Sequence, residues 1–167
     1  MYLDVPENFE GLLEVTNTRY LTRGLTSLKQ IPTSSIDVVI SNAVLEHILL
    51  DEFEYTISEL FRIQKQGGIT YHRVDFKDHL SRSLNSLRFS KQLWESSLFA
   101  KSGFYTNRLR AIDVVRSFKN QGYKIVSVRY DRWARIPLDR KLMSKDFQKY
   151  SDEDLLISGM DLQAIKQ

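Results

Sequence analysis

The feature that most constrains the fold is an apolar, β-branched run at residues 36–41, Ile36-Asp37-Val38-Val39-Ile40-Ser41. A run that lacks regular polar alternation is typical of a strand covered on both faces, as in a parallel sheet. Neighbouring parallel strands need a crossover connection, usually a helix. The residues after this run are therefore the place to look for a helix and a second strand.

Both patterns are present. After Asp51, a good N-cap residue, apolar residues recur with the spacing of an amphipathic helix, at Phe53, Ile57, Leu60 and Phe61. Gly67 and Gly68 are predicted to end this helix, and residues 69–75 to form the next strand. Strand, helix, glycine stop and strand make a βαβ unit, whose crossover is almost always right-handed.

The α/β pattern continues after one interruption. Residues 80–104 are predicted to form a helical insertion, and Thr106 to cap a helix over 107–120. Residues 123–130 alternate as a strand does, and a last strand is expected around 157–165. The chain is therefore predicted to be a single α/β domain, 1–167, with a mostly parallel sheet.

The first residues show no clear period. Residues 1–18 are interpreted as an irregular lead-in with one short helix. Tyr20-Leu21-Thr22 is predicted to form a short strand that ends at Gly24.

Composition excludes several classes of protein. A net charge of +3 is far short of the basic patch typical of nucleic-acid-binding proteins, so that function is the least favoured one. No apolar run reaches the roughly 20 residues that cross a bilayer. The chain has 0 cysteines, which rules out disulfides and thiolate metal sites. Its start lacks the pattern of a secretory signal, so a cytoplasmic location is expected.

Four segments of the chain, residues 37–48, 59–68, 72–79 and 159–166, form an ordered series. In that order they resemble segments of class I S-adenosylmethionine-dependent methyltransferases of the type 11/12-like kind. The first resembles that family's fourth strand and the loop after it, and the second the helix and turn before strand five. The third is similar to the exit of strand five, and the fourth to the antiparallel last strand. The resemblance covers roughly residues 19–167.

The resemblance implies a Rossmann-like methyltransferase sheet with an antiparallel last strand. It also implies S-adenosylmethionine as the cofactor and methyl transfer to a small-molecule or glycan-linked acceptor.

One departure from the family concerns the cofactor. The family places a glycine-rich turn after its first strand and an acid at the end of its second, but the 7 glycines here form no G-x-G pattern. Asp4 matches the ribose-binding acid in residue type alone. The domain is therefore expected to be amino-terminally truncated relative to the family, and inactivity of this form stays open.

The alternative is a non-catalytic, methyltransferase-like remnant that acts as an interaction or oligomerisation module. An incomplete sheet predicts an exposed edge, and with it a homodimer or a partner that completes the sheet.

Candidate site residues lie at the predicted strand ends, because ligands of open α/β sheets bind at the carboxyl edge. Ser41, Asn42 and Ala43 are expected on the cofactor's path; the alternative is an ordinary strand-to-helix turn.

His47, Asp75 and His79 are the candidate catalytic residues near the acceptor, with His47 as a general base. The alternative is a structural role in loop hydrogen bonds. A divalent metal held by Asp75, Asp78 and His79 is the less favoured interpretation, so no metal is predicted.

Asp78, Arg108 and Arg110 are the candidate substrate-binding residues. The two arginines are expected to hold a carboxylate or phosphate of the acceptor at a helix start. The alternative is that they are solvated side chains on a first helical turn.

Overall fold

The computed structural model describes residues 8–167. Its strands are β1 (Ile36–Asn42), β2 (Gln64–Asp75), β3 (Tyr123–Arg132) and β4 (Ile157–Lys166). Its α-helices are α1 (Phe9–Val15), α2 (Leu25–Lys29), α3 (Phe53–Ile63), α4 (Lys91–Trp94), α5 (Ser97–Ala100), α6 (Ala111–Asn120) and α7 (Asp152–Leu156). Short 3-10 turns are η1 (Leu45–His47), η2 (Asn85–Arg88), η3 (Arg140–Leu142) and η4 (Lys145–Phe147).

The four strands form one sheet in the order β1-β2-β4-β3. β1 runs parallel to β2, and β4 lies antiparallel between β2 and β3. Strands β1, β2 and β3 therefore point the same way and only β4 is reversed. This confirms the prediction of a mostly parallel α/β sheet with an antiparallel last strand.

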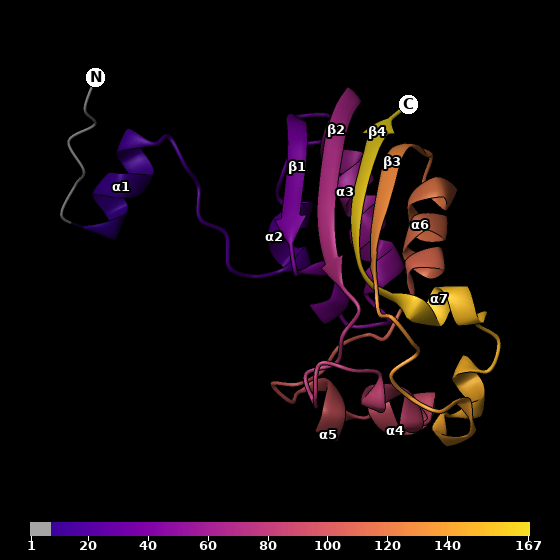
Figure 1. Ribbon diagram of the computed structural model, residues 1–167. Helices are drawn as coiled ribbons and strands as arrows, with labels where there is room; N and C mark the ends of the chain where they lie inside the picture. Colours follow the sequence, from indigo (N-terminus) through magenta and orange to yellow (C-terminus); the bar gives the residue numbers. More distant parts are fainter. Residues whose placement is uncertain (1–7) are drawn as a thin grey trace.

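Helices α3 and α6 pack on one face of this sheet (Figure 1). The main core lies between them and the strands, and its fully buried members include Ile57, Phe118, Met160 and Leu162. The amphipathic pattern predicted the buried side of α3 correctly, since Phe53, Ile57 and Leu60 are all buried. Each such side chain contributes roughly 1.5–3 kcal/mol to stability.

The insertion and the residues before β4 make a second, smaller core. Leu84 and Leu87 pack there with side chains from the segment between β3 and β4, which are Leu138, Met143, Phe147, Tyr150 and Leu155. The helices of the insertion lie beyond the carboxyl ends of β1 and β2 (Figure 1). This confirms the predicted helical insertion near 80–104 and shows which end of the sheet it extends.

Two predicted boundaries were wrong. Helix α3 ends at Ile63, and β2 begins at once at Gln64 and runs through Gly67 and Gly68. The register of β1 on β2 shifts between Ile36 and Val38, which absorbs the extra residues. Gly67 has φ of +75°, so the glycines turn the strand rather than stop the helix.

Helix α6 starts at Ala111, four positions after the predicted start at Asn107. The residues before it are buried and held by other segments, and Arg108 has φ of +61°, which a helix does not allow.

At the amino end, Tyr20-Leu21-Thr22 forms no strand, because no neighbouring strand in the described chain pairs with it. The short helix expected within residues 1–18 is present as α1. Asp4 lies outside the described residues.

Arg110 joins the sheet to α6. Its side chain is 1% exposed and donates hydrogen bonds to the carbonyls of Phe76, at the end of β2, and Ile157, at the start of β4. Burial lowers the pKa of the guanidinium to about 10, so it stays charged at neutral pH. The guanidinium carbon lies 5.0 Å from the centroid of the Phe76 ring, whose face attracts the positive charge.

We predict that Arg110→Ala destabilises the fold by about 2–4 kcal/mol, because it leaves two buried carbonyls unpaired and opens a cavity. Urea denaturation measures the change. Arg135→Ala removes an exposed arginine and should stay within about 0.5 kcal/mol of the parent. Equal effects of the two substitutions would contradict this role of Arg110.

Candidate active site at the carboxyl end of β1

A pocket of about 470 Å³ opens where the chain leaves β1. Its floor comes from the loop after β1, and its walls from α2 and the start of α3. The residues that line it are Leu21, Gly24, Leu25, Ser27, Leu28, Val44, His47, Ile48, Leu49, Glu52 and Thr56. The lining is mostly apolar, and His47 is the side chain in it best suited to proton transfer.

His47 is held in one tautomer. Its Nδ1 lies 3.1 Å from the backbone carbonyl oxygen of Tyr105. A carbonyl can only accept, so Nδ1 carries the proton and Nε2 keeps a lone pair. The imidazole is exposed on η1, and Nε2 is therefore available as a base.

Asn107 holds the loop that carries His47. Its side-chain amide donates to the carbonyls of Leu45, at 2.8 Å, and Ile48, at 3.0 Å, and its backbone N–H donates to the carbonyl of Glu46 at 2.8 Å. One buried asparagine thus satisfies three carbonyls on either side of His47. This is a positioning role, since it fixes the loop without reaching the pocket.

Glu46 ties the same loop to β2. Its carboxylate accepts from the backbone N–H of Asp75 at 3.2 Å, and the residue is 5% exposed. Burial raises the pKa of the Glu46 carboxyl above its ordinary value. Asp75 itself accepts at 2.9 Å from the N–H of Lys77, so it is engaged in the turn after β2.

The structure brings together two of the three predicted catalytic residues. The rings of His47 and His79 lie 4.9 Å apart between centroids. Asp75 is linked to this loop by its backbone N–H, which donates to the carboxylate of Glu46, the residue before His47. Within residues 8–167, no three histidine or acidic side chains form a metal-binding group.

The predicted cofactor residues face different ways. The Oγ of Ser41 lies 2.7 Å from Nδ1 of His72, which is fully buried against the helices. Asn42 is exposed on the opposite face of the sheet. Ala43 leaves β1 with φ of +52° and donates its N–H to the carbonyl of Arg73, so this turn is strained and fixed. Their role in cofactor binding stays a prediction.

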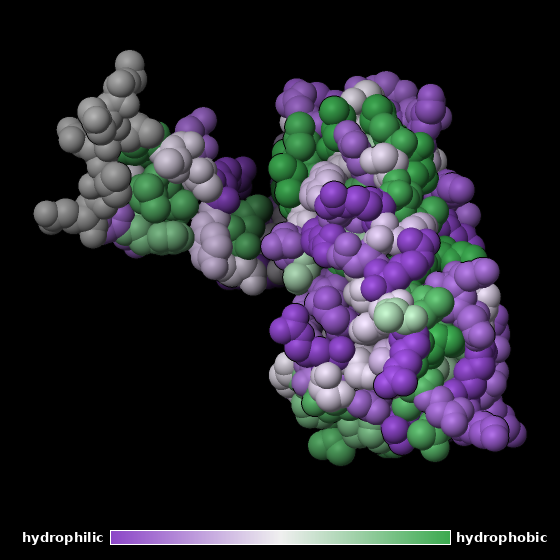
Figure 2. All heavy atoms as spheres, viewed as in Figure 1, coloured by the Kyte–Doolittle hydropathy of each residue, from purple (hydrophilic) through white to green (hydrophobic). Residues whose placement is uncertain are grey.

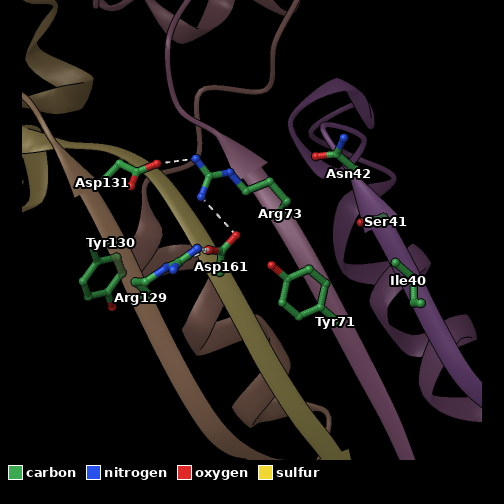
Figure 3. A pocket seen from close by; sticks show the side chains of 9 residues that line it. All are labelled: Ile40, Ser41, Asn42, Tyr71, Arg73, Arg129, Tyr130, Asp131 and Asp161. Carbon is green, nitrogen blue, oxygen red and sulfur yellow. Dashed lines mark hydrogen bonds and ion pairs between the residues drawn. The ribbon is translucent and has the colours of Figure 1, made fainter.

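That opposite face holds a second, shallower hollow of about 630 Å³ (Figure 3). Arg73 pairs there with Asp161 and Asp131, and Arg129 also pairs with Asp161. Gly159 leaves room for this network, because an added Cβ would lie 3.2 Å from Asp131 and 3.3 Å from Arg73. The charges are largely neutralised within the hollow.

Asp78, Arg108 and Arg110 do not form an open substrate site. Asp78 is 2% exposed and accepts backbone N–H bonds from its own loop. Arg108 is 6% exposed, lies over the Trp94 and Phe147 rings and donates to the carbonyls of Ser86 and Phe89. The prediction that these three residues bind an acceptor does not fit their burial.

Asn107 and Tyr105 are site residues that the sequence pattern does not reveal. Tyr105-Thr106-Asn107 has the pattern of a helix start, and nothing local shows that the helix begins later. Their partners lie about sixty residues earlier in the chain, so only the tertiary structure reveals the contact.

Comparison with known proteins agrees with the fold. Residues 7–72 match the family model of the methyltransferase domain. No curated protein sequence matches the chain.

Solved structures extend the likeness beyond the matched segment. An S-adenosylmethionine-dependent methyltransferase from Archaeoglobus fulgidus is similar over 98% of this chain and 74% of its own, with a TM-score of 0.56 and 13% identity. One from Methanosarcina mazei is similar over 82% of this chain and 62% of its own, with a TM-score of 0.53 and 16% identity. The chain is a class I methyltransferase-fold domain.

This methyltransferase-fold domain spans 62% and 74% of the lengths of those two proteins. Both similar structures are of S-adenosylmethionine-dependent methyltransferases. Among residues 8–167 no strand pairs with β1 on the side away from β2, and no glycine-rich turn lies there.

We predict that the domain loses stability as the pH falls from about 6.5 to about 4. Burial lowers the pKa of His72 to about 4 from an ordinary value of 6.5, so the unfolded state binds the proton first. The stability held above pH 6.5 is therefore lost on acidification, by about 3 kcal/mol from this group. Chemical denaturation across this range measures it.

His72→Gln is the matched variant, because an amide can donate and accept hydrogen bonds toward Ser41 and Thr70, the partners of His72, but does not titrate. It should show a flatter pH profile than the parent. An unchanged profile would contradict the assignment to His72.

Proposed function

We propose that this domain takes part in S-adenosylmethionine-dependent methyl transfer to a small-molecule acceptor, bound in the pocket that His47 lines. The observation that carries the proposal is the fixed tautomer of His47 at the carboxyl end of β1, the edge where open α/β sheets bind ligands. The family match and the fold support the reaction class.

His47 would act on the acceptor's proton. S-adenosylmethionine supplies an electrophilic methyl group when bound. Nε2 of His47 would take the proton that the acceptor's nitrogen or oxygen gives up on methylation, and the charged ring would keep its Nδ1–H bond to the carbonyl of Tyr105. Asn107 and Glu46 hold the loop in place, which supplies the alignment that methyl transfer depends on.

The pocket lining narrows the acceptor class. Leucine, isoleucine and valine side chains dominate, and the charged residue among the described lining is Glu52. No arginine or lysine lines it in this part of the chain, so a phosphate or carboxylate would lack a partner there. A neutral or cationic small molecule fits better than an anionic, glycan-linked one.

A non-catalytic interaction module is the second candidate. The exposed edge of β1, where Val38 is 53% and Ile40 is 72% exposed, favours it. A cytoplasmic location stays a prediction; no helix in the described chain is long and apolar enough to cross a membrane.

We predict that S-adenosylhomocysteine binds the chain in isothermal titration calorimetry, with millimolar affinity or tighter. The open donor side makes weak binding the expected result, since part of the usual enclosure is missing from the described residues. Absence of heat at millimolar ligand, with circular dichroism showing a folded protein, would contradict donor binding by this chain alone.

We predict that His47→Gln lowers label transfer from methyl-labelled S-adenosylmethionine to a pool of small amines and phenols by about 100-fold or more. Binding of S-adenosylhomocysteine should be unchanged, because the substitution removes a base and not the loop. Leu98→Gln, which changes a 77% exposed side chain on α5, is the control. Equal transfer by His47→Gln and the control would exclude His47 as the base.

A further inference from the structure

A small cavity lies where the helical insertion, the start of α6 and the segment between β3 and α7 meet. Its volume is about 160 Å³, and none of its lining residues lines the pocket of His47. Four of the lining residues are cations and two are acids: Lys91, Arg108, Arg116 and Lys149, and Asp113 and Asp146. We call this space the α6 cavity, and its lining carries a surplus of two positive charges.

The two acids of the α6 cavity are engaged with donors of the protein itself. Asp113 accepts from the hydroxyl of Tyr150 at 2.6 Å and pairs with Arg116 at 2.5 Å. Asp146 accepts from the backbone N–H of Lys91 at 2.7 Å, and this bond holds the pKa of its carboxyl below the ordinary value. Neither acid is therefore free to bind a cationic ligand.

Two lysines of the α6 cavity have exposed side chains. Lys91 begins α4 and Lys149 follows η4, so the two ammonium groups come from different segments of the chain. Within residues 8–167 neither forms an ion pair. Figure 2 shows hydrophilic residues, in purple, over the segment between β3 and α7, at the lower right of the view. Both lysines can donate to a ligand from solvent.

Arg108 adds a buried charge to the wall of the same cavity. Its side chain is 2% exposed, and its nearest acid is Glu95 at 3.4 Å. Its Nη1 donates to the carbonyls of Ser86 and Phe89, but its Nε has no hydrogen-bond partner among the described residues. Burial lowers the pKa of this guanidinium below its ordinary value. Its charge is therefore incompletely compensated, and an anion in the adjacent cavity would stabilise it.

We propose that the α6 cavity binds a phosphate group, either free inorganic phosphate or the phosphate of a small phosphomonoester. The surplus of two positive charges matches a phosphate dianion, whose oxygens accept charge-assisted hydrogen bonds from several directions. Lys91 and Lys149 bind the oxygens, and the buried charge of Arg108 attracts the anion from behind. A planar carboxylate carries one charge and leaves the other uncompensated.

This proposal does not rest on methyl transfer. The pocket of His47 has no lysine or arginine in its described lining, so the anion and the methyl acceptor occupy different places. Asn107 lies between them, because it lines the α6 cavity and also donates to the carbonyls of Leu45 and Ile48 in the loop of His47. The phosphate site is thus next to the residue that positions the candidate base.

A titration of the ¹⁵N-labelled chain with inorganic phosphate at constant ionic strength tests the site by NMR. Backbone amide shifts should saturate with a Kd of about 1 mM and centre on residues 91, 107–109 and 146–149. Glycerol 3-phosphate separates the two sources of phosphate: binding about tenfold tighter indicates a phosphomonoester, and equal or weaker binding indicates free phosphate. Shifts that do not saturate by about 50 mM, or that spread over other surfaces, would overturn the proposal.

A matched pair of double variants separates the site from general charge. Lys91→Gln combined with Lys149→Gln should raise the phosphate Kd about tenfold or more, because it removes both exposed donors. Lys141→Gln combined with Lys145→Gln removes the same charge from exposed lysines that line neither cavity, and should change the Kd less than about twofold. Circular dichroism checks that both variants are folded. Equal weakening in the two would show attraction by net charge alone and would overturn the site.

Discussion

Within residues 8–167 helices cover one face of the sheet and leave the other uncovered, and most other features of the structure depend on that asymmetry. Side chains of β2 alternate across it, so Thr70, His72 and Val74 are buried under α3 and α6 while Tyr71 and Arg73 are not. The buried row has to satisfy its polar groups internally, as His72 does with Ser41 and Thr70. The open row instead pairs its charges across strands.

The candidate site depends on contacts between segments far apart in the chain. The loop after β1 carries His47, but its conformation is set by Tyr105 and Asn107, which precede α6. Those residues are in turn held where they are because Arg108 and Arg110 are buried next to them and bonded to backbone carbonyls. These contacts fix the conformation of the loop and the tautomer of His47, whose Nε2 is the base.

Sequence patterns predicted what depends on local spacing. The β-branched run became β1, the amphipathic spacing gave the buried side of α3, and the last strand is antiparallel. They failed where another segment overrides local preference. Tyr105-Thr106-Asn107 looks like a helix start, yet hydrogen bonds to the loop after β1 hold Asn107 outside the helix. Arg108 and Arg110 look like exposed cations but occupy the interior.

The sequence by itself determined the class of fold and the edge of the sheet where chemistry is expected, because hydrophobic periodicity and chain order carry that information. Only the tertiary structure decided which polar residues reach that edge. His47 and His79 meet there, while Ser41 turns inward to His72 and the two arginines are buried. The physical reason is that burial and hydrogen-bond partners are set by packing between distant segments, which residue type and spacing do not encode.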